Sequence, residues 1–368
     1  MRAKPGPAGL PRLRAVIPQA FGQSRPFTVG IEEELFALDA TTLEPRPFPQ
    51  ERFDGQRLKA ELFASVVELN TGVCESVEQA AAELRELRAA AKGRAAEAGL
   101  VLAAAGTWPT AVPEEQAITQ DPGYLAFVEY AGSSARRQYC SGLHVHVGVP
   151  SAEACMAALE AVLPWLPVLL AVSANSPYLA DRETGLASTR GEILALLPRA
   201  GAPPVFESYE EWEEFAERLV RLGLADQYTR IWWDIRPHPR FGTLELRMPD
   251  QPTQVEVSAA FAALFQALVA TAAEAGMRAP ADRGVYAQNR WAAARFGPAA
   301  ELIHPDGDRL IGARQLLTEL LDRVEPAARG LGGGKPTILE GLRQADDQLE
   351  IGRAEGLRSL EERLVALT

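Results

Sequence analysis

The chain has 368 residues, and its 37 Lys and Arg residues against 49 Asp and Glu residues give a formal net charge of -12. A chain this acidic is poorly suited to bind a nucleic acid or an anionic membrane surface, so we expect neither partner. A hydrophobic content of 47% and a charged content of 23% are typical of folded globular proteins and exclude disordered, collagen-like and coiled-coil chains.

The N-terminal stretch, residues 1–24, is basic and rich in proline, and it lacks the unbroken apolar run of a secretory signal. We expect it to form a flexible arm. The three cysteines, Cys74, Cys140 and Cys155, form no CxxC pair, so neither a disulfide framework nor a thiolate zinc site is predicted. A reducing cytoplasm is therefore the expected location.

The first predicted strand lies in RPFTVGIEEELFALD, where polar and apolar residues alternate. Alternate residues of a strand share a face, so Glu32 and Glu34 point one way while Ile31 and Leu35 point the other. Glu33 interrupts the apolar face. A metal-binding pair of carboxylates and an ordinary water-facing strand both fit this pattern.

The segment ELFASVVELN supplies a second apolar run with two further glutamates. Glu61 and Glu68 are seven positions apart, and an odd spacing cannot place both on one face of a regular strand. We expect Glu68 to occupy a strand position and Glu61 to enter the site from the preceding turn.

A long alanine-rich helix is predicted after these strands, up to Gly99. Ser76, followed three residues later by Gln79, matches a capping box and marks its start. VLAAAGTWP is the next predicted strand, while residues 111–137 have too mixed a pattern to assign.

CSGLHVHVGVP alternates again, with Leu143, Val145 and Val147 on one face and two histidines on the other. Single histidines in strands are often structural. Two of them, His144 and His146, at strand spacing favour a metal or phosphate site about as much as a structural role.

A charge-free stretch, residues 161–180, follows a predicted helix start at Ser151 and raises the question of a membrane span. Pro164, Pro167 and Pro177 interrupt it, which leaves an apolar part of a length typical of a buried helix. A loop rich in glycine, proline and serine comes next, and then an amphipathic helix in YEEWEEFAERLVRLG.

Two strands around the turn HPRFG are predicted in IWWDIRPHPRFGTLELRMPD. Glu245 and Arg247 share a face there, as either site residues or a surface ion pair. Thr253 with Glu256 forms a second capping box, and helices are expected over most of the remaining chain. Separate strands and long helices without regular βα alternation indicate an α+β fold with an antiparallel sheet.

These strands together offer carboxylates, imidazoles and arginines on polar faces. Oxygen-rich ligand sets select hard cations, so magnesium is expected, with manganese as the alternative and zinc less favoured. Magnesium in proteins commonly shares its coordination with phosphates, which points to ATP. The sequence contains neither a Walker motif nor the protein-kinase motifs.

Four blocks in this order, FTVGIEEELF, CSGLHVHVGV, NSPYLADRETGLASTR and WWDIRPHPRFGTLELRMPD, resemble the glutamate-cysteine ligase type 2 family, in particular its carboxylate-amine ligase branch. The similarity runs from about Phe27 to about Gly297. It implies a glutamine-synthetase-like fold, in which a curved antiparallel sheet backed by helices forms a funnel for ATP and magnesium ions. It also favours one catalytic domain over residues 25–368.

The resemblance implies roles for individual residues. Arg247 would face the γ-phosphate of ATP and act with Arg236 in catalysis, while Arg190, Arg290 and His146 would bind phosphate or substrate. The implied metal ligands are Glu32, Glu34, Glu61, Glu68, His144 and Glu245.

The implied reaction transfers the γ-phosphoryl group of ATP to a carboxylate, after which an amine displaces phosphate and forms an amide or γ-peptide bond. Glutamate and cysteine are the usual substrates of the family, although activity on this pair is often weak in this branch. Two alternatives stay open: a guanidino or amino-acid phosphotransferase, and a non-catalytic sensor of a nucleotide or amino acid. Family habit also suggests a homodimer.

Overall fold

The computed structural model describes residues 17–275 and 279–368 and contains a seven-stranded antiparallel sheet. The strand order is β10-β11-β5-β1-β3-β2, and β4 pairs with the far end of β1. This confirms the predicted α+β class with an antiparallel sheet. The strands of the sheet are β1 (Val29–Asp39), β2 (Leu58–Ala60), β3 (Val66–Asn70), β4 (Leu100–Ala103), β5 (Leu143–Gly148), β10 (Ile235–His238) and β11 (Thr243–Leu246).

Three two-stranded pieces lie outside the main sheet. They are β6 (Tyr178–Leu179) with β7 (Arg182–Glu183), β8 (Ala200–Gly201) with β9 (Trp232–Trp233), and β12 (Glu301–Ile303) with β13 (Leu310–Gly312).

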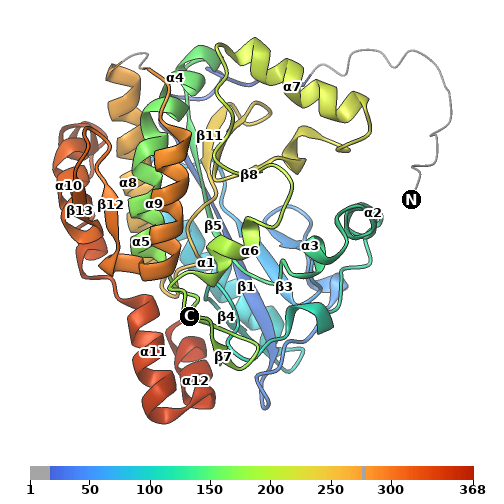
Figure 1. Ribbon diagram of the computed structural model, residues 1–368. Coiled ribbons are helices and arrows are strands. Elements are labelled where there is room, and N and C mark those ends of the chain that lie inside the picture. The colour runs from blue at the N-terminus through green and yellow to red at the C-terminus, as the bar shows by residue number, and fades with distance from the viewer. Residues whose placement is uncertain (1–16, 276–278) are drawn as a thin grey trace.

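Helices cover one face of the sheet and surround its ends (Figure 1). Those behind the sheet are α1 (Val77–Ala96), α4 (Ala152–Val162), α5 (Leu166–Ser173), α8 (Val255–Ala275), α9 (Arg283–Phe296) and α10 (Ala313–Gly330). The others are α2 (Pro122–Ala131), α3 (Ser133–Arg136), α6 (Thr189–Leu194), α7 (Tyr209–Arg221), α11 (Gln344–Glu355) and α12 (Leu357–Leu367).

The strands present alternating faces, as their sequences predict. Ile31, Val145 and Leu244 are almost completely buried in one apolar core with residues of α4 and α8. Burial of each such side chain contributes about 1.5–3 kcal/mol, so this packing fixes which face of the sheet carries the polar residues.

Glu33 is the exception on the apolar face, and the structure explains it. Its carboxylate is 0% exposed and accepts hydrogen bonds from Arg88 Nε at 2.6 Å and Arg88 Nη2 at 2.8 Å. Gln251 and Ser258 also donate to it. A buried charge needs a hydrogen-bonded partner, and Arg88 of α1 provides one from behind the sheet.

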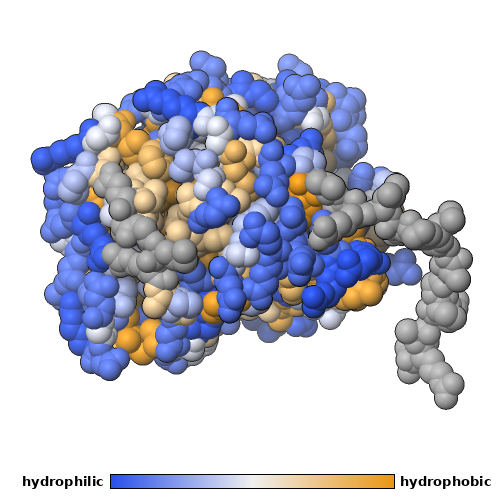
Figure 2. Space-filling view, turned by 90° about the horizontal axis from the view of Figure 1, so that it is seen from above, coloured by the Kyte–Doolittle hydropathy of each residue, from blue (hydrophilic) through white to orange (hydrophobic). Residues whose placement is uncertain are grey.

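The apolar stretch after Ser151 is a pair of buried helices, as expected. Two segments, Ala152–Ser173 and Val255–Ala273, are long and apolar enough to cross a membrane, but 83% and 78% of their most apolar windows are buried within the protein. They form the core behind the sheet. The face seen from above in Figure 2 mixes hydrophilic and hydrophobic side chains.

The two predicted capping boxes have different outcomes. Ser76 caps α1, since its hydroxyl accepts the Gln79 N–H at 3.2 Å. The Thr253 prediction is wrong, because α8 begins at Val255 and the Thr253 hydroxyl instead accepts a hydrogen bond from Asn175. The unassigned residues 111–137 contain α2 and α3.

Residues 17–24 were expected in the flexible arm, but they pack against the sheet. Ile17 is 8% exposed, and the Ala20 N–H donates to Pro239 O at 2.8 Å, in the turn between β10 and β11. Gly22 N–H donates to Val149 O at 3.1 Å. The remainder of the predicted arm, 1–16, lies outside the described residues.

Candidate active site

The polar face of the sheet brings the predicted residues together through strand register. Glu32 lies opposite His144, and Glu34 lies opposite Glu68. On the other side of β5, Glu245 of β11 lies opposite His146 and is flanked by Arg236 of β10. Directly paired residues have their Cβ atoms about 4.5–5.5 Å apart, so register alone concentrates these charges on one surface.

This surface forms the wall of a cavity of about 900 Å³. Eight of the predicted site residues line it: Glu32, Glu34, Glu61, Glu68, His144, Arg190, Arg236 and Arg247. Three do not: His146, Glu245 and Arg290. The cavity is large enough for a ligand of nucleotide size.

Three carboxylates, which we call the acidic trio, meet at one end of the face. Glu34, Glu61 and Glu68 each have an oxygen within 4.8 Å of the others, and Glu61 enters from the segment after β2, as predicted. Burial and the neighbouring charges of Glu68 and Glu34 raise the pKa of Glu61 well above its ordinary value. Burial likewise raises the pKa of Glu34. Crowded carboxylates of this kind are stabilised by a bound cation.

Lys59 is a neighbour of the acidic trio that the sequence analysis missed. Its ammonium lies 3.3 Å from Glu68 Oε1, and it lines the cavity. Lys59 lies directly opposite Glu68 in the β2–β3 pair. The sequence feature that could have identified it is its position two residues before Glu61, near the end of a strand.

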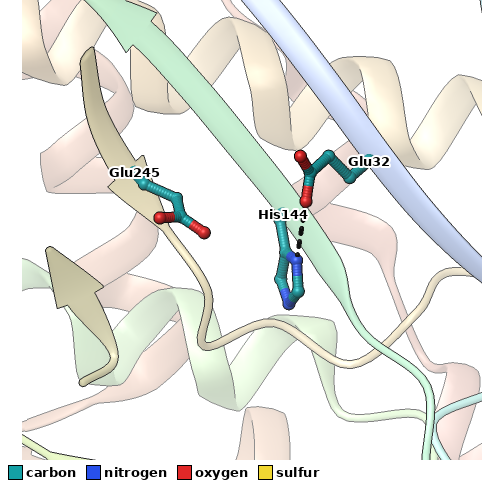
Figure 3. A group of neighbouring side chains, drawn as sticks. All are labelled: Glu32, His144 and Glu245. Carbon is teal, nitrogen blue, oxygen red and sulfur yellow. Dashed lines mark hydrogen bonds and ion pairs between the residues drawn. The ribbon is translucent and has the colours of Figure 1, made fainter. Parts of the chain in front are cut away.

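A second possible ligand group joins Glu32, His144 and Glu245 from three adjacent strands (Figure 3). His144 Nδ1 lies 3.2 Å from Glu32 Oε2. Burial and the nearby Arg247 charge lower the pKa of His144 to about 4, so its imidazole is neutral and able to bind a metal. Burial opposes ionisation of Glu32, but the hydrogen bonds and charges of His144 and His146 hold the pKa of Glu32 well below its usual value.

Glu245 is also the partner of both catalytic arginine candidates. Arg236 Nε donates to Glu245 Oε2 at 2.5 Å, and Arg247 donates to the other oxygen. Although burial favours the neutral acid, these two guanidinium charges hold the pKa of Glu245 well below its usual value. Glu245 therefore stays ionised and fixes both arginines at the cavity wall.

His146 has a less direct position than His144. Its Nδ1 is 3.0 Å from Thr243 Oγ1, while its buried Nε2 has no hydrogen-bond partner among the described residues and lies 3.4 Å from Glu32. Burial lowers its pKa, but the charges of Glu245 and Glu32 outweigh this and raise it overall. The neighbouring carboxylates thus favour the charged form of His146.

The guanidinium groups of Arg190 and Arg290 form hydrogen bonds with other groups of the protein. The Arg190 guanidinium donates to the carbonyl oxygens of Met248 and Arg247, at 2.8 and 3.1 Å. It lies on Gly142, where a Cβ would come within 1.9 Å of it, so this contact requires glycine. Arg190 fixes the strand that carries Arg247 and reaches the cavity wall from behind.

Arg290 lies one residue behind the cavity wall, and its role in binding a ligand stays a prediction. Its Nε donates to Asp234, which lines the cavity, at 2.8 Å, and its Nη2 donates to the Gly191 carbonyl at 2.7 Å, while Arg290 itself is not a lining residue. It therefore links α9 to α6 and to Asp234, two residues before Arg236.

The turn between β10 and β11 also contributes residues that the sequence analysis missed. His238, Arg240 and Phe241 line the cavity, and within residues 17–275 and 279–368 the buried His238 Nδ1 has no hydrogen-bond partner. The available signal was the turn HPRFG itself, which joins two strands already expected to carry site residues.

Known proteins resemble this chain over most of its length. A family model described as "Glutamate-cysteine ligase family 2(GCS2)" matches residues 28–362. A Rubrobacter xylanophilus protein named "Putative glutamate--cysteine ligase 2-3" is 43% identical over 319 residues, which cover 85% of this chain and 87% of the relative. A Sorangium cellulosum protein named "Putative glutamate--cysteine ligase 2" is 37% identical over 343 residues, with coverage of 88% and 91%.

Two solved structures share the fold at low sequence identity. The glutamate-cysteine ligase of Francisella tularensis in complex with AMP has a TM-score of 0.68 at 15% identity and covers 94% of this chain and 89% of its own. A bifunctional glutathione synthetase from Pasteurella multocida has a TM-score of 0.66 at 16% identity, with coverage of 93% and 52%.

The family match and the curated relatives support a carboxylate-amine ligase of the glutamate-cysteine ligase type, and the solved structures share its fold, a glutamine-synthetase-like architecture. The chain belongs to glutamate-cysteine ligase family 2.

Proposed function

We propose that the protein is an ATP- and magnesium-dependent ligase that joins the γ-carboxylate of glutamate to cysteine or another amine through an acyl phosphate. One observation carries the proposal. The acidic trio and the Arg236–Glu245–Arg247 cluster lie on the same face of one sheet, at the wall of one cavity. Phosphoryl transfer needs both components, a site for cations and a set of positive groups.

The donor groups fit magnesium. The acidic trio offers only carboxylate oxygens, and the Glu32 group adds two carboxylates and one neutral imidazole. Hard oxygen donors suit magnesium, or manganese as the alternative. The raised pKa of Glu61 marks a buried carboxylate crowded by the charges of Glu68 and Glu34. When bound, the ion would offset the negative charge of the phosphates during transfer.

The arginines then have a definite task. Arg236 and Arg247 are held in place by Glu245, so they meet the γ-phosphoryl group without first having to be ordered. The donor carboxylate attacks phosphorus, ADP leaves, and an acyl phosphate forms. The amine nitrogen attacks its carbonyl carbon, phosphate departs and the nitrogen loses a proton, which leaves an amide. A walled cavity limits competing attack by water.

The named relatives support this assignment. The curated relatives carry glutamate-cysteine ligase names, and the Francisella tularensis ligase of the same fold holds AMP. Small-molecule carboxylates and amines are therefore the proposed substrates. A cytoplasmic location and a homodimeric assembly complete the proposal.

Phosphate release from Mg–ATP tests the proposal in a matrix of carboxylate donors against amine acceptors, with mass spectrometry on every positive well. Release that requires both substrates, together with an amide product, is the expected result and names the substrates. A stable phosphorylated product without an amide would instead identify a phosphotransferase. Nucleotide binding without turnover in any well would favour a sensor.

A further inference from the structure

Strand β1 loses its neighbour on one edge at the position of Glu34. On this edge β5 pairs with β1 up to Glu33, and β4 pairs with it only from Phe36 onward. Both lie on the edge opposite β3, because Glu32 and Phe36 each pair with β3 as well. In the described part of the chain, residues 34 and 35 therefore have no strand beside them on this edge. A backbone polar group in such a gap needs another partner.

The side chain of Gln251 fills this gap. Its Oε1 accepts the Glu34 N–H at 3.1 Å, while its Nε2 donates to Glu33 Oε1 at 3.0 Å and to Pro252 O at 2.9 Å. Gln251 is 0% exposed and is not one of the residues that line the cavity. Because both amide protons have acceptors and the amide oxygen has a donor, the group keeps one orientation between two consecutive glutamates.

The backbone of Gln251 supports the carboxylate end of the same glutamate. Its N–H donates to Ser141 O at 3.1 Å, and the neighbouring Gly142 and Asp250 form an isolated antiparallel bridge. The Gly142 N–H donates in turn to Glu34 Oε2 at 2.6 Å. The Gln251 side chain thus holds the main chain of Glu34, and its backbone holds the segment that binds the Glu34 carboxylate.

Glu34 is the member of the acidic trio that this arrangement controls. It has a carboxylate oxygen within 4.8 Å of oxygens of Glu61 and Glu68, and it lies opposite Glu68 in the β1–β3 pair. The hydrogen bond from Gly142 fixes one of its oxygens, so the direction of the carboxylate depends on where β1 lies at this position. Groups that orient the ligands of a metal commonly affect its affinity by about 10–100-fold.

We propose that Gln251 is a positioning residue for the cation site of the acidic trio. It acts through Glu34 and does not line the cavity itself. The inference rests on the proposed function, because it takes the acidic trio as a site for magnesium or manganese. Glu33, the other glutamate that the amide contacts, also accepts hydrogen bonds from Arg88 and Ser258. A change at Gln251 is therefore expected to act on the site mainly through Glu34.

Calorimetric titration of the metal-free protein with Mn²⁺ alone tests the proposal without any need for turnover. Gln251→Met removes the acceptor for the Glu34 N–H and should weaken Mn²⁺ binding about tenfold. Gln251→Asn keeps the amide but shortens the side chain by one methylene group. It should shift the affinity in the same direction, and it serves if Gln251→Met does not fold. In a Glu34→Gln background, Gln251→Met should cause little further loss, because both changes act through one carboxylate.

Ser258→Ala is the matched control, because Ser258 is also 0% exposed and its hydroxyl donates to Glu33 Oε1, the same oxygen that Gln251 binds. It should lower Tm and leave Mn²⁺ affinity unchanged. Equal losses of Mn²⁺ affinity in Ser258→Ala and Gln251→Met would overturn the assignment, as would wild-type affinity in both Gln251 variants. Wild-type protein that bound no Mn²⁺ would overturn it as well. If the expected pattern is found while no substrate pair yields an amide, the positioning role stands and the ligase proposal falls.

Discussion

Glu245 is the residue on which both arginines of the cavity depend. Its side chain is 1% exposed, while those of Arg236 and Arg247 are 7% and 16% exposed. A buried carboxylate between two guanidiniums neutralises part of their charge and fixes their direction. Glu245 therefore affects stability as well as chemistry, because its removal leaves two buried cations without their partner.

Glu245→Gln should lower kcat about 100-fold or more per folded molecule, since the arginines lose the group that orients them. We also expect a lower Tm. Phosphate release, normalised to the folded fraction from circular dichroism, measures the effect. Glu75→Gln is the control, because Glu75 is exposed and pairs only with exposed Arg25. Normal activity per folded molecule would contradict the assigned role.

Glu61 should make the stability of the metal-free protein depend on pH. Its pKa in the folded state is raised above the ordinary value of 4.5. The stability associated with its neutral form is therefore complete below about pH 4.5 and is lost as pH rises through the raised pKa. As pH rises from about 4.5 through the raised pKa of Glu61, the Tm of Glu61→Gln should increasingly exceed that of the wild type. Added Mg²⁺ should remove this difference in Tm. Parallel Tm curves for the two proteins would contradict this.

At the scale of elements, β1 shows how one strand serves two sides of the sheet. Glu32 and Glu34 face the cavity, and Glu33 faces the helices behind. Arg88 therefore stabilises the strand that carries the ligands without lying in the cavity.

Arg88→Met should destabilise the fold by about 3–5 kcal/mol, because it leaves the Glu33 carboxylate buried without a countercharge. The double variant Glu33→Met/Arg88→Met should recover much of that loss. Urea unfolding of both variants measures the effect, with Arg85→Met of the same helix as the control, since Arg85 pairs with exposed Glu256 at the surface. A double variant no more stable than Arg88→Met would show that the pair is not the cause.

Gly242 connects the β10–β11 hairpin to the segment beneath it. Its φ is +67°, and a Cβ there would lie 2.3 Å from Ala20 O. Gly242→Ala should therefore displace the turn from residues 17–24, and we expect a lower Tm and weaker Mg–ADP binding. Gly307→Ala, at a glycine with open space around it, is the control. Unchanged Mg–ADP affinity would show that the turn does not contribute to nucleotide binding.

Strand alternation explains why so much of the site could be predicted from sequence. The faces that carry Glu32, Glu34, His144, His146 and Glu245 follow from the period of two, and the strand register confirms them. Arg247 lies just beyond the end of β11 and also reaches the cavity wall. The partners across space could not be predicted in this way. Arg88 reaches Glu33 from a residue 55 positions away, and Arg290 reaches Asp234 from 56 positions away. The Thr253 hydroxyl likewise accepts a hydrogen bond from Asn175, a tertiary contact that local sequence patterns do not reveal.

At the scale of the whole molecule, the cavity concentrates negative charge in a chain that is already acidic. Removal of divalent ions by EDTA should abolish ATP turnover, and Mg²⁺ or Mn²⁺ should restore it. Mg²⁺ should also raise Tm, because it binds the folded acidic trio and not the unfolded chain. Phosphate release and thermal melting measure the two effects. Full turnover in EDTA would exclude the metal assignment.

The homodimer remains a prediction that sedimentation velocity can decide. A single species near the monomer mass of 39.8 kDa across micromolar concentrations would exclude it.

The pairing of Glu33 with Arg88 should also disfavour a misaligned β1 during folding. Three consecutive glutamates look almost the same after a shift of one residue, yet such a shift would reverse the face of every β1 side chain. It would turn both Glu32 and Glu34 toward Arg88, which can serve as the bidentate partner of one carboxylate. Arg88 can therefore neutralise one glutamate on its side of the sheet, and a second buried carboxylate there would destabilise the misaligned strand. The Arg88→Met variant should refold with an additional slow phase, because some molecules would first have to leave the shifted register. Stopped-flow fluorescence that found only the wild-type phases would argue against this role of Arg88.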